Sequence, residues 1–246
     1  MDFTILGFII VGFVAQLLDG CLGMAYGVIS TTFLTGIGIP AAAASASVHT
    51  SEIFTTAVSG FSHFKFENID KELVKKLLIP GVIGGIIGAY ILTAVPGDKI
   101  KPFVTVYLLI MGIVIVAKAF KNQVPKEVKT KIVPLGFIGG FFDAIGGGGW
   151  GPIVTSTLVA RGNCPRYTIG SVNFSEFFVT VAQSVTFFLT IGLTHWKIIL
   201  GLLLGGVVAA PFAAFSCKKL PHKPLMVLVG LLIIILNLRT LIILYI

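Results

Sequence analysis

The stretch that decides the fold runs from residue 143 to residue 151 and reads Asp143-Ala-Ile-Gly-Gly-Gly-Gly-Trp-Gly151. It joins two apolar runs, 132–145 and 150–160. Glycine is less favourable than alanine inside a helix by about 1 kcal/mol, so four in succession predict a helix break. A related stretch, Asp19-Gly-Cys-Leu-Gly-Met-Ala-Tyr-Gly27, joins the apolar runs 3–18 and 24–39. The chain thus carries two glycine-containing interruptions, each of which begins with an aspartate.

The composition indicates that both interruptions lie inside a lipid bilayer. Of 246 residues, 56% are hydrophobic and 11% are charged, whereas a soluble domain has about 25% charged residues. A helix crosses about 30 Å of hydrocarbon in about 20 residues, so the chain has room for several spans and no sizeable soluble domain. The net charge of +8 is explained by basic loops, which orient membrane proteins, rather than by nucleic-acid binding. The three cysteines have no CxxC spacing, and the sequence predicts no metal site and no cofactor.

The second half of the chain repeats the first. When residues 12–60 are aligned with residues 136–184, 15 of 49 pairs are identical, whereas chance predicts roughly 4. The four acidic residues within apolar segments form two matched pairs, Asp19 with Asp143 and Glu52 with Glu176. We therefore expect a first repeat over 1–120, a cytoplasmic linker over 121–131 and a second repeat over 132–246.

The basic residues predict how the repeats are related. If each repeat is a glycine-tipped re-entrant hairpin followed by three transmembrane helices, 14 of the 18 basic residues lie on one side of the membrane. If instead each first segment is one broken crossing, the division is 11 to 7. We therefore predict an all-α integral membrane protein with two inverted repeats and both termini outside. Two short complete spans per hairpin would give the same parity, but runs of about 11 to 16 residues are too short to cross.

The hairpin tips are candidate anion sites. The second half-helix of each hairpin begins just after the tip, so its free N–H groups and its positive dipole end point toward the middle of the membrane. Asp19 and Asp143 are expected to brace the tips by accepting backbone hydrogen bonds. The alternative is that the glycines only allow close helix packing. On the first reading, the bulky substitution Gly148→Leu should abolish binding and leave the protein folded.

A polar stripe follows each hairpin. Ser45, His49, Glu52 and Thr56 lie on one helix face, and Asn173, Glu176 and Thr180 continue the pattern 124 positions later. A carboxylate at membrane depth usually pairs, titrates or meets an ion. Glu52 and Glu176 are therefore candidates for proton coupling, with an interhelical hydrogen bond as the structural alternative.

The chain resembles a known family in two motifs, Gly139-Gly-Phe-Phe-Asp-Ala-Ile-Gly-Gly-Gly-Gly-Trp-Gly-Pro152 and Arg166-Tyr-Thr-Ile-Gly-Ser-Val-Asn173. Together with the duplicated arrangement, they resemble the TauE/SafE family of sulfite and organosulfonate exporters, also called toluene-sulfonate uptake permeases. The resemblance implies secondary transport of small sulfur-containing anions across the inner (plasma) membrane of a prokaryote. It covers nearly the whole chain.

The leading hypothesis is an exporter that works by alternating access, with the anion between the two tips near the midplane. The alternatives are a passive anion channel and an uptake permease for another small oxyanion or carboxylate. We do not expect an enzyme, because no nucleophile and base occur at a recognised spacing. The expected partners are a small anionic substrate, protons as the coupling ion and the lipid bilayer; the sequence predicts no oligomeric state. The expected substrate-binding residues are Gly23, Met24, Ala25, Tyr26, Ser47, His49, Ser51, Gly147, Gly148, Gly149, Trp150, Ser171, Asn173 and Ser175.

Overall fold

The computed structural model describes residues 5–22, 24–65, 67–120, 131–161, 163–216 and 222–245. Within these ranges all regular structure is helical, as predicted. Gly23 and almost all of the predicted linker over 121–131 lie outside the described residues.

The two halves of the chain contain corresponding helices in the same order. The described residues of the first half form α1 (Ile5–Leu22), α2 (Tyr26–Gly36), α3 (Ala41–Lys65), α4 (Lys71–Ala94) and α5 (Gly97–Phe120). The second half has α6 (Ile132–Gly146), η1 (Gly151–Thr155), α7 (Ser156–Ala160), α8 (Pro165–Ile191), α9 (Trp196–Ser216) and α10 (His222–Tyr245). The counterpart of α2 is divided into a π-helical turn, η1, and the short helix α7. Pro152 lies in the first turn of η1, where proline is tolerated because the N–H groups of that turn have no intrahelical acceptor.

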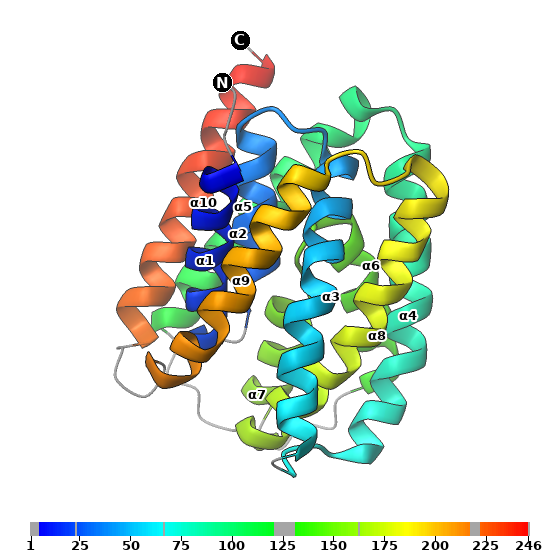
Figure 1. Cartoon of the computed structure of the whole chain (residues 1–246), viewed down its shortest axis with the longest axis vertical. Helices are drawn as coiled ribbons and strands as arrows, with labels where there is room; N and C mark the ends of the chain where they lie inside the picture. Colours follow the sequence, from blue (N-terminus) through cyan, green and yellow to red (C-terminus); the bar gives the residue numbers. More distant parts are fainter. Residues whose placement is uncertain are drawn as a thin grey trace.

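Corresponding helices run in opposite directions along the bundle (Figure 1). In this view α3 descends whereas α8 ascends, and α4 ascends whereas α9 descends. The beginning of α1 and the end of α10 lie at the same, upper end of the molecule. In the part of the chain that the structure describes, four segments are long and apolar enough to cross a membrane, namely α4, α5, 167–191 and 226–245. Large apolar side chains such as Phe61, Phe103 and Leu189 are exposed on the outside, as expected for a surface that faces lipid.

The halves are interleaved rather than side by side. The first helix of each half packs along the fourth helix of the other, α1 on α9 and α6 on α4. Helices α3 and α8, which carry the two polar stripes and are called the polar helices below, pack against each other. Helices α5 and α10 also pack against each other. Small residues permit this close contact, and a Cβ atom at Gly140 would overlap the backbone of Gly81 across the α6–α4 contact. The interleaving brings the two hairpins and the two polar helices together in the interior of the bundle.

Candidate functional site

Each hairpin tip is closed by its own aspartate. Asp19 Oδ1 accepts hydrogen bonds from the backbone N–H groups of Ala25 at 2.6 Å and Tyr26 at 3.1 Å. Asp143 Oδ1 accepts from the N–H groups of Gly149 at 2.6 Å and Trp150 at 2.9 Å. In both halves, the carboxylate satisfies N–H groups at the start of the second half-helix that have no partner within the helix. These contacts are the ones required of a residue that braces the tip.

The two tips touch through their backbones. A Cβ atom added to Gly27 would lie 2.5 Å from the carbonyl oxygen of Gly147 and 2.6 Å from the Cα of Gly148. Thr31 Oγ1 also donates a hydrogen bond to the Gly147 carbonyl at 2.9 Å. Gly147 ends α6 in the left-handed region, with φ of 64°, a conformation that glycine adopts without strain. Because the tips are in contact here, a ligand has room only beside the contact.

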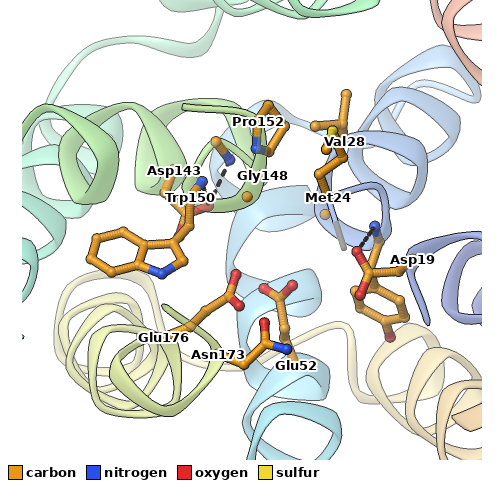
Figure 2. A pocket seen from close by; sticks show the side chains of 14 residues that line it. Asp19, Met24, Val28, Glu52, Asp143, Gly148, Trp150, Pro152, Asn173 and Glu176 are labelled. Atoms are coloured by element: carbon orange, nitrogen blue, oxygen red, sulfur yellow. Dashed lines mark hydrogen bonds between the residues drawn. The ribbon is translucent and has the colours of Figure 1, made fainter. Parts of the chain in front are cut away.

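A narrow pocket with a volume of about 20 Å³ lies beside the tip contact (Figure 2). Its walls come from both tips and from the polar helices α3 and α8. The lining residues are Asp19, Met24, Tyr26, Gly27, Val28, Glu52, Asp143, Gly148, Gly149, Trp150, Gly151, Pro152, Asn173 and Glu176. Four of the fourteen are acidic and none is Lys or Arg. In Figure 2 the side chains of Glu52, Asn173 and Glu176 point toward the centre of this space.

His49 connects the polar helix of the first half to the tip of the second. It is fully buried and stacks on Phe187 with ring centroids 6.1 Å apart. Its Nε2 lies 3.1 Å from the backbone carbonyl oxygen of Asp143 and its Nδ1 lies 3.2 Å from Glu52 Oε2. A carbonyl oxygen only accepts hydrogen bonds, so Nε2 carries a proton. The Nδ1–Glu52 contact then holds one proton, either on the ring or on the carboxyl group.

The second half lacks this pair because Asn173 occupies the position that corresponds to His49. Asn173 Nδ2 donates to Ser59 Oγ at 3.1 Å and thereby links α8 to α3. Within the described ranges, no donor makes a hydrogen bond to the Glu176 carboxyl group. Glu52 and Glu176, which match in sequence, therefore have different surroundings.

Asp143 has the largest number of hydrogen bonds in the site. Besides the two N–H groups at Oδ1, its Oδ2 accepts from Gln183 Nε2 at 3.0 Å. Its backbone carbonyl accepts from His49 Nε2 and from Gly148 N at 3.1 Å. Gln183 is buried on α8, seven residues after Glu176 and therefore on the same helix face. One aspartate thus joins α6, the second tip, α3 and α8.

The structure brings ten of the predicted residues to the pocket. They are Asp19, Met24, Tyr26, Glu52, Asp143, Gly148, Gly149, Trp150, Asn173 and Glu176. Ala25, His49 and Gly147 are not among its described lining residues, and Gly23 is outside the described residues. Sequence reasoning missed Gly27, Val28, Gly151 and Pro152 as lining residues. The identity of Gly27 and Gly151 at matched positions was the signal that pointed to them.

The four predicted serines do not line the pocket. Ser47 Oγ donates to the Ala43 carbonyl at 2.7 Å, and Ser51 Oγ donates to the carbonyls of Ser47 and Ile199. In the second half, Ser175 Oγ donates to Ser171 O, and Ser171 Oγ accepts from Asp70 N at 2.8 Å. Serine in a helix commonly bonds the carbonyl one turn earlier. The expectation that these hydroxyls contact the anion therefore has no support in their geometry.

Two other expectations need correction. The N–H groups of Ala25, Tyr26, Gly149 and Trp150, expected to hold the anion, already donate to aspartates. Gly148→Leu was expected to leave the protein folded, but a Cβ atom at Gly148 would overlap the backbone of Gly27 and Val28. That variant would force the tips apart, so it cannot separate binding from folding.

The described ranges contain no group of three His, Cys, Asp or Glu side chains arranged to hold a metal ion.

The aromatic walls are fixed through their polar atoms. Trp150 Nε1 donates to the Val172 carbonyl at 3.1 Å, and the Tyr26 hydroxyl donates to the Leu202 carbonyl at 3.2 Å. Both rings are almost completely buried. The pocket thus has rigid sides and a carboxyl-rich interior.

Residues 8–240 match the family described as sulfite exporter TauE/SafE. The chain is 46% identical to the probable membrane transporter protein YtnM of Bacillus subtilis (strain 168), in an alignment that covers 96% of this chain and 82% of that relative. No solved structure gives a significant match.

Proposed function

Since this chain belongs to the TauE/SafE family, we propose that it is a secondary membrane transporter that exports small sulfur-containing anions such as sulfite or organosulfonates. The observation that carries the proposal is a pocket whose lining residues come from both glycine-rich tips and both polar helices. Transporters with repeated halves bind their substrates at such junctions of discontinuous helices. The family name supports the sulfur-containing substrate and the direction of transport.

We further propose that the two halves are inverted repeats that work by alternating access. The opposite directions of α3 and α8, and of α4 and α9, support this relation (Figure 1). Each hairpin is then re-entrant, with its tip at the shared pocket. Rocking of one half against the other about the Gly27–Gly147 contact would open the pocket first to one side and then to the other.

Backbone N–H groups are the proposed anion ligands. The first N–H groups of a helix have no intrahelical acceptor, and the helix dipole favours an anion there. Asp19 and Asp143 already accept hydrogen bonds from the first N–H groups of each half-helix. The next backbone N–H groups that line the pocket belong to Gly27, Val28 and Gly151. The Asn173 amide adds a polar group from α8. Because none of the described lining residues is Lys or Arg, the anion would bind weakly and be readily released, as transport requires.

Transport in proteoliposomes tests the proposed function. We expect saturable, electrogenic export of thiosulfate or sulfite that depends on an imposed pH difference. Flux that rises linearly with anion concentration and ignores the pH difference would indicate a passive channel instead. Absence of flux and of binding for sulfite, thiosulfate, taurine, sulfoacetate and carboxylate analogues would overturn the proposal.

The proposed orientation has its own test. With both termini outside, the 121–131 linker lies in the cytoplasm and 14 of the 18 basic residues share its side. A fluorescent protein that matures only in the cytoplasm should remain dark when fused to the C-terminus and should fluoresce when inserted in the linker. A fluorescent C-terminal fusion would contradict the inverted-repeat topology.

A further inference from the structure

We propose that Glu176 binds the anion as a neutral carboxylic acid, so that a proton accompanies each anion through the pocket. The proposal rests on the proposed function and names its coupling residue. It makes the two halves unequal: Glu176 donates its O–H to the anion, whereas Glu52, at the matched position, keeps its hydrogen bond to His49.

The pocket is lined by acidic side chains. Among the described residues that line the pocket, four carry carboxyl groups and none is Lys or Arg. An anion placed among four carboxylates in a poorly solvated space would be repelled by all of them. Anion binding here therefore requires at least one of the carboxyl groups to be neutral.

The aspartates hold their own tips together. Asp19 Oδ1 accepts from two N–H groups of the first tip, and its Oδ2 accepts from no donor among the described residues, so Asp19→Asn serves as a further control that should keep the pH-dependent loss. Both oxygens of Asp143 already accept hydrogen bonds, from two N–H groups and from the Gln183 amide. An added proton would have to displace one of these donors.

The His49–Glu52 pair also has no need of another proton. Its Nδ1–Oε2 contact of 3.2 Å contains one proton in either of its two forms, His⁺ with carboxylate or neutral His with carboxylic acid. The pair is neutral overall in both forms. His49 is fully buried and Glu52 is 6% exposed, so a second proton would leave a net charge in the interior.

Glu176 is the carboxyl group of the pocket that neither holds a tip nor contacts the histidine. It points into the pocket (Figure 2), and no donor among the described residues makes a hydrogen bond to it. The other acidic groups among the described lining residues are Asp19 on α1, Glu52 on α3 and Asp143 on α6. Two basic side chains contact the groups around the pocket: His49 contacts Glu52 and the Asp143 carbonyl, and Lys118 on α5 donates to the carbonyl of Pro152. Neither makes a hydrogen bond to Glu176. The phenols of α2 and α5 nearest the tips donate elsewhere, Tyr26 to Leu202 O and Tyr107 to Gly148 O.

A neutral carboxyl group has one O–H to donate, and an oxyanion is an acceptor without donors of its own. The proton comes from the solution on the side where the anion enters and leaves with the anion on the other side. A dianion carried with one proton moves one net negative charge. An inside-negative membrane potential therefore drives it outward.

Thiosulfate binding to the purified protein tests this role. Thiosulfate stays fully ionised across the neutral range, whereas sulfite titrates there and would confuse the result. For the wild type we expect constant affinity at low pH and then a loss of about tenfold per pH unit up to about pH 9, once Glu176 ionises in the empty protein. Glu176→Gln keeps an N–H donor and removes the titration, so its affinity should not change with pH.

The control variants separate Glu176 from its matched partner. Glu52→Gln should keep the pH-dependent loss, and Glu176→Asp, which retains a carboxyl group, should keep it too. Infrared difference spectra should show a protonated carboxyl band that responds to thiosulfate in the wild type and not in Glu176→Gln. A wild-type affinity that is constant up to about pH 9, or a pH-dependent loss that persists in Glu176→Gln, would overturn the inference and leave the transporter proposal intact. Failure of the wild type to bind any of the anions would overturn both.

Discussion

Asp143→Asn is expected to destabilise the protein and to abolish transport. The carboxylate accepts two N–H groups at Oδ1 and the Gln183 amide at Oδ2. An asparagine keeps one acceptor and turns an NH₂ group toward either the tip or Gln183, so two donors face each other. Loss of a buried, charge-assisted hydrogen bond with an unsatisfied partner costs about 2–4 kcal/mol. Thermal unfolding in detergent should therefore shift clearly downward, and proteoliposomes should carry no anion.

Asp19→Asn is the matched control in the first half. Both N–H groups there are accepted by Oδ1 alone, so the amide oxygen of asparagine can replace it. We expect a cost of about 1 kcal/mol, the loss of charge assistance without an orphaned donor. Asp98→Asn, at an exposed position, should change nothing. Equal stability losses for Asp19→Asn and Asp143→Asn would show that the Gln183 contact does not matter.

Gly27→Ala is expected to separate the two tips. The added Cβ would lie 2.5 Å from Gly147 O and 2.6 Å from Gly148 Cα, and both are backbone atoms that cannot rotate away. Such overpacking costs about 1–3 kcal/mol, and here it acts where the halves touch. Transport should be lost even in protein that remains folded, because the tip contact also forms one wall of the pocket.

Gly36→Ala tests whether this effect is local. Gly36 ends the same helix, α2, and a Cβ atom there would meet no atom within 4 Å. Alanine favours the helix over glycine by up to about 1 kcal/mol, so stability should be unchanged or slightly higher and transport should be normal. If Gly27→Ala also transported normally, the contact between the two tips would not be needed for transport.

Local patterns in the sequence were enough to predict the helical membrane class and the family. Each membrane helix must by itself be apolar enough and long enough to lie in lipid, so apolar content and run length are visible in the sequence of that helix alone. The acceptance of tip N–H groups by Asp19 and Asp143 is also local, because donor and acceptor are six or seven residues apart. Helical spacing likewise placed His49 and Glu52 on one face.

Only the tertiary structure decided what each of those faces meets. Ser51 donates to Ile199 O, which is 148 residues away, and His49 bonds Asp143 O, which is 94 residues away. Helical periodicity shows that a face is polar, but a hydroxyl is satisfied equally well by an anion or by a carbonyl group of a neighbouring helix. The touching tips, the different surroundings of Glu52 and Glu176, and the role of Gln183 depend on the interleaving of the two halves. Those contacts join residues far apart in the chain, and no spacing rule within one helix specifies them.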